Sequence, residues 1–209
     1  MRSIPLLLAV LLVLPLMSGT GAHAQTTPQT APKWYGGQIS MRVESQGGNG
    51  ITANEFVAAS QDSAKSWTDV TGSSIMVNAS ETFAAQSSPR WGDYNNNDSA
   101  HEIFFVTTNN EWSQATGAGA GGTLGVTVAP WTAWSCNQRE FYDADILING
   151  FVQDGWSATS VEETVLHEIG HAIGLGHPCL AGWNGCSSSC QAVMAASGGD
   201  FTTPQQDDI

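Results

Sequence analysis

Three histidines lie at spacings that suit a metal ion. His167 and His171 are about one helical turn apart, because successive residues of an α-helix advance by about 100°, so both imidazoles can reach one ion from the same face. A third histidine, His177, would lie about 9 Å further along if the helix continued. The chain must therefore turn after His171, and Gly174 permits this because glycine accepts the positive φ that ends a helix.

These residue types favour zinc in a catalytic site. Two imidazoles leave a tetrahedral Zn²⁺ short of ligands, and a third nitrogen with one open position is typical of catalytic sites, whereas structural sites are closed. Glu168 projects beside the first two histidines. A buried helix with two histidines would explain H-x-x-x-H alone, but not the whole segment H-E-x-x-H-x-x-G-x-x-H over residues 167–177.

The first 24 residues have the pattern of a secretory signal peptide. One early cation, Arg2, precedes an apolar run over residues 4–17, and the A-x-A ending at Ala24 suits cleavage before Gln25. The run is short for a helix that spans a bilayer, although an uncleaved membrane anchor is the alternative. We therefore expect a secreted protein with no membrane partner after cleavage.

Length and charge indicate one acidic domain. Residues 25–209 suffice for one domain with a sizeable core and are too few for two ordinary ones. The chain carries 19 acidic and six basic residues, a net charge of −13, so nucleic acid and anionic membranes are poor partners. We expect a disordered lead-in over residues 25–33, a folded domain over 34–209 and a monomer, with Ca²⁺ as a further possible ligand of the acidic groups.

Apolar patterns predict an α/β sheet domain. Strands are predicted at 38–43, 74–77, 102–106, 123–128 and 145–149, with helices after residues 52 and 160. The histidine-bearing helix is expected to pack beneath the sheet, and the continuous apolar centre of 102–106 predicts a parallel neighbour. Thr52 with Glu55 is expected to cap the first helix, and Ser160 with Glu163 the second.

One predicted strand has the features of a peptide-binding edge. It contains Leu124, Gly125 and Val126, and its glycine weakens side-chain packing and lets another backbone approach. Main-chain pairing at such an edge would hold an extended peptide of varied sequence. The alternative is a plain edge strand.

Four cysteines are expected to form two disulfides. Cys136, Cys179, Cys186 and Cys190 are even in number and belong to a chain predicted to be secreted. Three connectivities are possible, and we expect Cys136 to pair with one of the three later cysteines. A zinc ligand provided by the Cys179 thiolate is the competing interpretation.

The zinc segment, with Met194 downstream in A-V-M-A-A-S, resembles the metzincin zinc endopeptidases and, among these, the matrixins. Further matrixin-like landmarks are Trp34, Trp67, the Asp-rich turn before Ile103, residues 124–127, residues 145–149 and the terminal residues 206–209. Together they extend over most of the chain from residue 34.

The resemblance implies a fold and a set of roles. A twisted, mostly parallel sheet with an antiparallel edge strand would form an upper subdomain over 34–174, followed by a small irregular lower subdomain over 175–209. His167, His171 and His177 would bind Zn²⁺, and Glu168 would be the catalytic acid/base. Met194 would form a hydrophobic floor under the metal without ligating it.

Some features depart from the matrixin pattern. Pro178 after the third histidine is similar to the serralysin branch. Residues 25–33 leave no room for a cysteine that blocks the zinc, and His101 is the only further histidine after the signal peptide, so we expect no second, structural zinc. A helix start at Thr203 is followed by few residues, which indicates either a fragment or a lost final helix.

The resemblance therefore implies a secreted, zinc-dependent endopeptidase acting on extended polypeptides. Zn²⁺ would activate water and polarise the scissile carbonyl, and Glu168 would carry the proton from the water to the leaving amine. The alternative is a secreted, non-catalytic protein of the same fold that keeps zinc and a peptide groove. The intact Glu168 weighs against it, because such a protein has no use for that carboxylate.

Overall fold

The computed structural model describes residues 33–85, 98–117, 122–135, 138–152, 154–177, 193–194 and 201–204. Its elements are η1 (Tyr35–Gly37), β1 (Gln38–Ser45), α1 (Ala53–Thr68), β2 (Met76–Ala84), β3 (His101–Val106), α2 (Asn109–Thr116), β4 (Gly125–Val128), β5 (Trp131–Ser135), β6 (Gln138–Phe141), β7 (Asp145–Asn149) and α3 (Ala158–Ala172). The expected signal peptide and all four cysteines lie outside the described residues.

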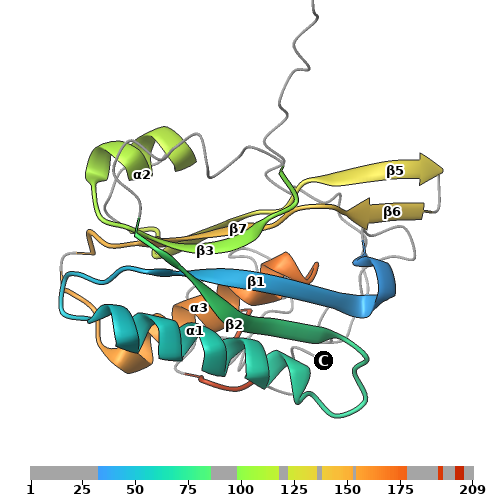
Figure 1. The fold of residues 1–209 in the computed structure, drawn as a ribbon, viewed down its shortest axis with the longest axis horizontal. Helices are drawn as coiled ribbons and strands as arrows, with labels where there is room; N and C mark the ends of the chain where they lie inside the picture. Colours follow the sequence, from blue (N-terminus) through green and yellow to red (C-terminus); the bar gives the residue numbers. More distant parts are fainter. Residues whose placement is uncertain are drawn as a thin grey trace, which may run out of the picture.

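A five-stranded sheet in the order β2-β1-β3-β7-β4 forms the centre of the fold (Figure 1). β1 pairs in parallel with β2 and β3, and β3 pairs in parallel with β7. β4 is antiparallel to β7, with Gly125 opposite Ile148 and Thr127 opposite Ile146. The predicted α/β class with a mostly parallel sheet is therefore confirmed.

Helices cover both faces of this sheet. α1 and α3 lie together on one face and α2 lies on the other, while β5 and β6 form a hairpin that extends past the end of the sheet (Figure 1). On the α2 face, a small cluster of buried side chains consists of Phe104, Val106, Trp112 and Leu147. We call this the α2-side core.

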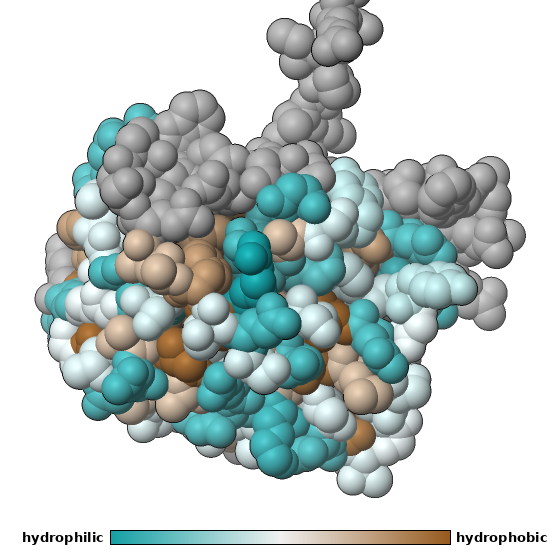
Figure 2. Space-filling view, viewed as in Figure 1, coloured by the Kyte–Doolittle hydropathy of each residue, from teal (hydrophilic) through white to brown (hydrophobic). Residues whose placement is uncertain are grey.

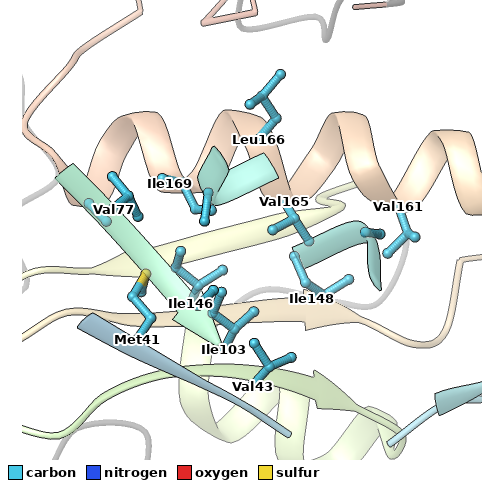
Figure 3. Close-up of a cluster of buried hydrophobic side chains, with 14 of the residues drawn as sticks. Met41, Val43, Val77, Ile103, Ile146, Ile148, Val161, Val165, Leu166 and Ile169 are labelled. Atoms are coloured by element: carbon cyan, nitrogen blue, oxygen red, sulfur yellow. The ribbon is translucent and has the colours of Figure 1, made fainter. Parts of the chain in front are cut away.

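The larger core lies between the sheet and the helices α1 and α3. Val161, Val165 and Ile169 of α3 point towards the strand side chains, among them Ile146 and Ile148 of β7 (Figure 3). Because side chains alternate along a strand, Leu147 between these two isoleucines belongs to the α2-side core. Strand β7 is thus buried on both faces, which explains its continuous apolar run.

Helix α1 begins as expected and is fastened to α3. Thr52 and Glu55 form the predicted capping box. Trp67, near the end of α1, is buried and donates its indole N–H to the backbone oxygen of Leu166 at 2.8 Å. Leu166 points away from the sheet (Figure 3), so α3 makes contacts on two sides and its orientation is fixed by both.

The predicted cap of α3 is wrong by about one turn. The N-cap is Ser157, and Ser160 is the third helical residue, whose side chain completes the capping box in place of Glu163. The physical reason lies just upstream, where buried Trp156 donates its backbone N–H to Asn49 at 2.7 Å. That anchor brings the chain into helical conformation before Ser160.

Two other features differ from the sequence-based expectations. Helix α2 and the β5–β6 hairpin were not predicted, and β2 begins at Met76 and ends at Ala84, later and longer than expected. Helix α2 is short and mostly polar, so only buried Trp112 marks its inner face. An eight-residue helix with one strongly apolar contact leaves little periodic signal in a sequence.

The surface over α1 and β2 mixes hydrophilic and neutral residues, with hydrophobic residues in small separate groups (Figure 2). The large hydrophobic residues exposed within the described ranges are Tyr35, Met76, Leu124 and Tyr142. None of the helices in the described part of the chain is long and apolar enough to cross a membrane.

Candidate metal centre

The end of α3 and the turn after it bring the three histidines together. His167 and His171 lie in the last turns of α3, which ends at Ala172. Gly174 then takes a φ of 102°, as predicted, and its N–H donates to the oxygen of His171 at 2.9 Å. The chain reverses there, and this reversal carries His177 back to the helix.

The three imidazoles converge on one point. Nε2 of His177 lies 3.0 Å from Nε2 of His167 and 3.0 Å from Nε2 of His171. The ring centroids are between 4.7 and 5.0 Å apart. Within the described ranges, this is the one group of three or more metal-binding side chains whose ligand atoms lie within 4.8 Å of one another.

The other nitrogen of two of the rings is held by the backbone. Nδ1 of His167 lies 2.7 Å from the oxygen of Val193, and Nδ1 of His171 lies 2.9 Å from the oxygen of Leu175. A carbonyl oxygen can only accept, so each Nδ1 carries a proton and each Nε2 presents a lone pair. Such outer hydrogen bonds fix the tautomer and ring orientation of metal-binding histidines.

Burial favours the neutral form of these rings. It lowers the pKa of His171 to about 3, with a further lowering from the charge of His167, and it also lowers the pKa of His177. Neutral imidazole is the form that binds a metal. The Nε2 lone pairs of His167 and His171 both point to where Nε2 of His177 lies, 3.0 Å from each, so the donor set fits a cation, and imidazole ligands suit zinc.

Glu168 is buried beside the histidines and is held by strand β4. The Oγ1 atom of Thr127 lies 2.6 Å from Oε2 of Glu168 and 2.9 Å from its backbone oxygen. Burial raises the pKa of Glu168 to about 7, against the opposing effect of the hydrogen bond from Thr127. Sequence reasoning did not identify Thr127, because strand periodicity carries no information about which helix residue it meets.

Gly125 lies where strand β4 passes closest to Glu168. A Cβ atom at this position would lie 2.7 Å from Cγ of Glu168 and 2.7 Å from its Oε1. The sequence-based expectation was that this glycine lets another backbone approach, and that remains a prediction. In the structure, the group that lies against Gly125 is the side chain of Glu168.

The other predicted edge-strand residues flank this contact. Leu124 is 46% exposed and directly precedes β4, and Val126 packs on the α2-side core. Asn149 fixes the start of the strand, because its side-chain amide donates to the oxygen of Thr123 at 2.8 Å and its backbone N–H to Leu124 at 2.9 Å. Asn149 was also not identified from the sequence.

Met194 lies against the helix that carries the histidines. It is 1% exposed, and a Cβ atom at Gly170 would overlap its sulfur and approach Trp67. The preceding residue, Val193, supplies the carbonyl that orients His167. Residues 193–194 thus support the candidate metal centre in two ways: Met194 packs against α3 at Gly170, and Val193 accepts the hydrogen bond from His167.

Several predicted features fall on residues that are not described. Cys136, Cys179, Cys186, Cys190 and Pro178 lie outside the described residues. The disulfide pairing and the competing thiolate ligand remain predictions. Most of the Asp-rich turn before Ile103 also lies outside them.

Comparisons with known proteins give no match. No protein-family model matches this chain, and none of the curated proteins matches it. The assignment of a class therefore rests on the fold, the histidine cluster and the groups around it.

Proposed function

We propose that the protein is a secreted, zinc-dependent endopeptidase of the metzincin class, matrixin-like in its zinc segment and landmarks. The observation that carries this proposal is the convergence of three Nε2 atoms at the end of α3, the helix that also carries the buried Glu168 next to His167. His167, His171 and His177 would hold the metal. When bound, Zn²⁺ lowers the pKa of its water towards ~7 and polarises the carbonyl under attack.

The side chain of Glu168 supplies the proton transfers. Its carboxylate takes a proton from the attacking water and gives it to the amine of the leaving peptide. Burial raises the pKa of Glu168 above its usual value, which favours release of the proton to the amine, whereas a bound cation would lower this pKa and favour the ionised form that accepts the proton. Burial, the main cause of this pKa, also keeps bulk water from competing.

Strand β4 is the proposed binding site for the substrate main chain. It is the last strand in the sheet order, paired with β7 on one side. An extended peptide beside it would form main-chain hydrogen bonds, which tolerate varied side chains. We propose polypeptides as the substrate class on this basis, and the exposed Leu124 as a contact at the start of the groove.

Casein cleavage by the purified protein tests the proposal. We expect cleavage that stops with a zinc chelator and returns with added Zn²⁺. Glu168→Ala should retain bound zinc and lower turnover by at least about 100-fold, because a general acid/base contributes roughly 10²–10⁴.

Two outcomes would contradict the proposal. Near-normal turnover by Glu168→Ala would remove this residue from the mechanism. Wild-type protein that binds zinc and peptides but cleaves neither casein nor a peptide library would instead be the non-catalytic binding protein.

A further inference from the structure

Strand β4 presents one small residue and one hydroxyl to the same carboxylate. Because side chains alternate along a strand, Gly125 and Thr127 share one face, while Val126 and Val128 share the other and pack on the α2-side core. Gly125 leaves room for the carboxyl group of Glu168, and Thr127 hydrogen-bonds it. The face of β4 that meets α3 is therefore shaped around a single side chain.

The hydroxyl of Thr127 contacts Glu168 at two points. Oγ1 of Thr127 lies within hydrogen-bond distance of both the backbone oxygen and the side-chain Oε2 of Glu168. One hydroxyl therefore contacts both the backbone and the carboxyl group of this residue. Among the residues that the structure describes, Thr127 makes the only hydrogen bond to the carboxylate, and it leaves Oε1 without one. A hydrogen bond to a carboxylate is charge-assisted and therefore stronger than a neutral one.

The position of this hydroxyl is set by the sheet. Thr127 is paired with Ile146 in the register between β4 and β7, and Ile146 is fully buried in the core. Glu168, by contrast, has three side-chain torsions, and fixing them costs rotamer entropy. A rigid strand thus restrains a side chain that its own helix would leave free.

We propose that Thr127 is a positioning residue for Glu168, whose hydroxyl holds the carboxylate through Oε2 and so fixes the orientation of the group that transfers protons. This inference rests on the proposed peptidase function. Misplacement of a reacting group by about 1 Å can cost on the order of 100-fold in rate, so the restraint acts on turnover. Zinc binding and peptide pairing depend on other atoms, and both persist when the hydroxyl is removed.

Substitution of the hydroxyl alone tests the inference. Thr127→Val keeps the branched shape and the strand preference and replaces the hydroxyl by a methyl group. We expect its kcat on a quenched fluorescent peptide to fall roughly 10- to 100-fold, as for outer groups that orient active-site residues. KM should stay within about threefold, with an unchanged zinc content and a similar melting temperature.

Two further comparisons separate loss of the Thr127 hydroxyl from a general effect of substitution on the fold. Thr127→Ser keeps the hydroxyl and should stay within about threefold of wild-type kcat, whereas Thr127→Ala should not; this pair decides the matter if Thr127→Val does not fold. Thr82→Val makes the same chemical change on the exposed face of β2 and should leave kcat unaltered.

The inference is overturned if Thr127→Val keeps kcat within twofold, if only KM changes, or if the serine and alanine variants lose activity equally. Wild-type protein that carries zinc and cleaves no peptide would refute the proposed function itself, and the inference with it. An active wild type with an unaffected Thr127→Val variant would refute the inference alone.

Discussion

At the scale of single residues, the surroundings of Glu168 set the strictest requirements. The carboxyl group fits between the hydroxyl of Thr127 and the bare backbone of Gly125. Neither residue is a metal ligand, and neither is distinguished in the sequence from ordinary strand residues. Their importance arises from the packing of α3 against β4, which brings together positions about 40 residues apart.

Gly125→Ala should lower activity more than stability. The added methyl group would meet Cγ and Oε1 of Glu168, which belong to a flexible side chain, so the fold can adjust by moving that side chain. We expect kcat for peptide cleavage to fall at least about tenfold, with bound zinc retained and a melting temperature within a few degrees of the wild type.

The matched control is Gly176→Ala. A Cβ atom at Gly176 would meet none of the described residues within 4 Å, although Gly176 is next to the candidate ligand His177. Its kcat should stay close to that of the wild type. Equal activities of the two alanine variants would show that the contact between Gly125 and Glu168 does not matter for catalysis.

At the scale of elements, the strands with strong apolar patterns were predictable, as were the helices with clear caps. The apolar run of β7 and the capping box of Thr52 and Glu55 are local signals, so the sequence displays them directly. Helix α2 buries one apolar side chain, Trp112, beside the buried Glu111, and leaves no such pattern.

The candidate site divides in the same way. The spacing of His167, His171 and His177 follows from helix geometry and a glycine turn, so their meeting could be predicted. The contacts of Thr127 with Glu168 depend on the position of β4 relative to α3 along the helix axis, and sequence periodicity does not specify that position. The sequence therefore reveals the metal ligands and leaves their supporting groups hidden.

The start of α3 provides a test at the same scale. Ser157 caps the helix by accepting from the N–H of Ser160, so Ser157→Ala should cost about 1 kcal/mol. For a domain of this size, that corresponds to a melting temperature lower by roughly 2–4 °C. Thermal unfolding followed by circular dichroism would measure the change.

Ser160→Ala serves as the comparison. The Ser160 hydroxyl accepts the backbone N–H of the N-cap residue Ser157 but none from the first helical turn itself, so its loss should cost less. A larger effect from Ser160→Ala than from Ser157→Ala would place the cap at Ser160 instead.

At the scale of the whole molecule, acidic groups dominate, and one of them, Asp145, is buried at the start of β7. Asp145 is 3% exposed, and its Oδ1 has no hydrogen-bond partner among the described residues. Burial raises the pKa of Asp145 to about 8, and the neighbouring charges of Asp143 and Glu102 raise it further. The folded protein therefore holds a proton there that the unfolded chain releases near pH 4.

The contribution of Asp145 to stability should consequently fall as pH rises from about 4 to about 8. Over this range the folded state binds the Asp145 proton and the unfolded state does not, so this contribution is complete below pH 4 and is lost as pH passes the folded-state pKa. Asp145→Asn removes the titration and keeps a polar side chain of the same shape. We expect the variant to gain about 3–4 kcal/mol relative to wild type at pH 8 compared with pH 5, from about 1.4 kcal/mol for each pKa unit.

Urea unfolding of both proteins at each pH, in calcium-free buffer, measures this difference. Comparing the two proteins at the same pH cancels the titration of the other carboxylates and histidines. A difference in unfolding free energy that does not change with pH would show that Asp145 is ionised in the folded protein.

Gly170 has a consequence for protein engineering. Because Gly170 has no side chain, Trp67 of α1 and Met194 can both pack against the backbone of α3 at this point. Grafting residues 167–177 onto another scaffold would copy the ligands but not this three-way contact. A transplanted motif would also need partners equivalent to Trp67 and Met194, supplied by two separate segments of the new scaffold, to pack its helix as it is packed here.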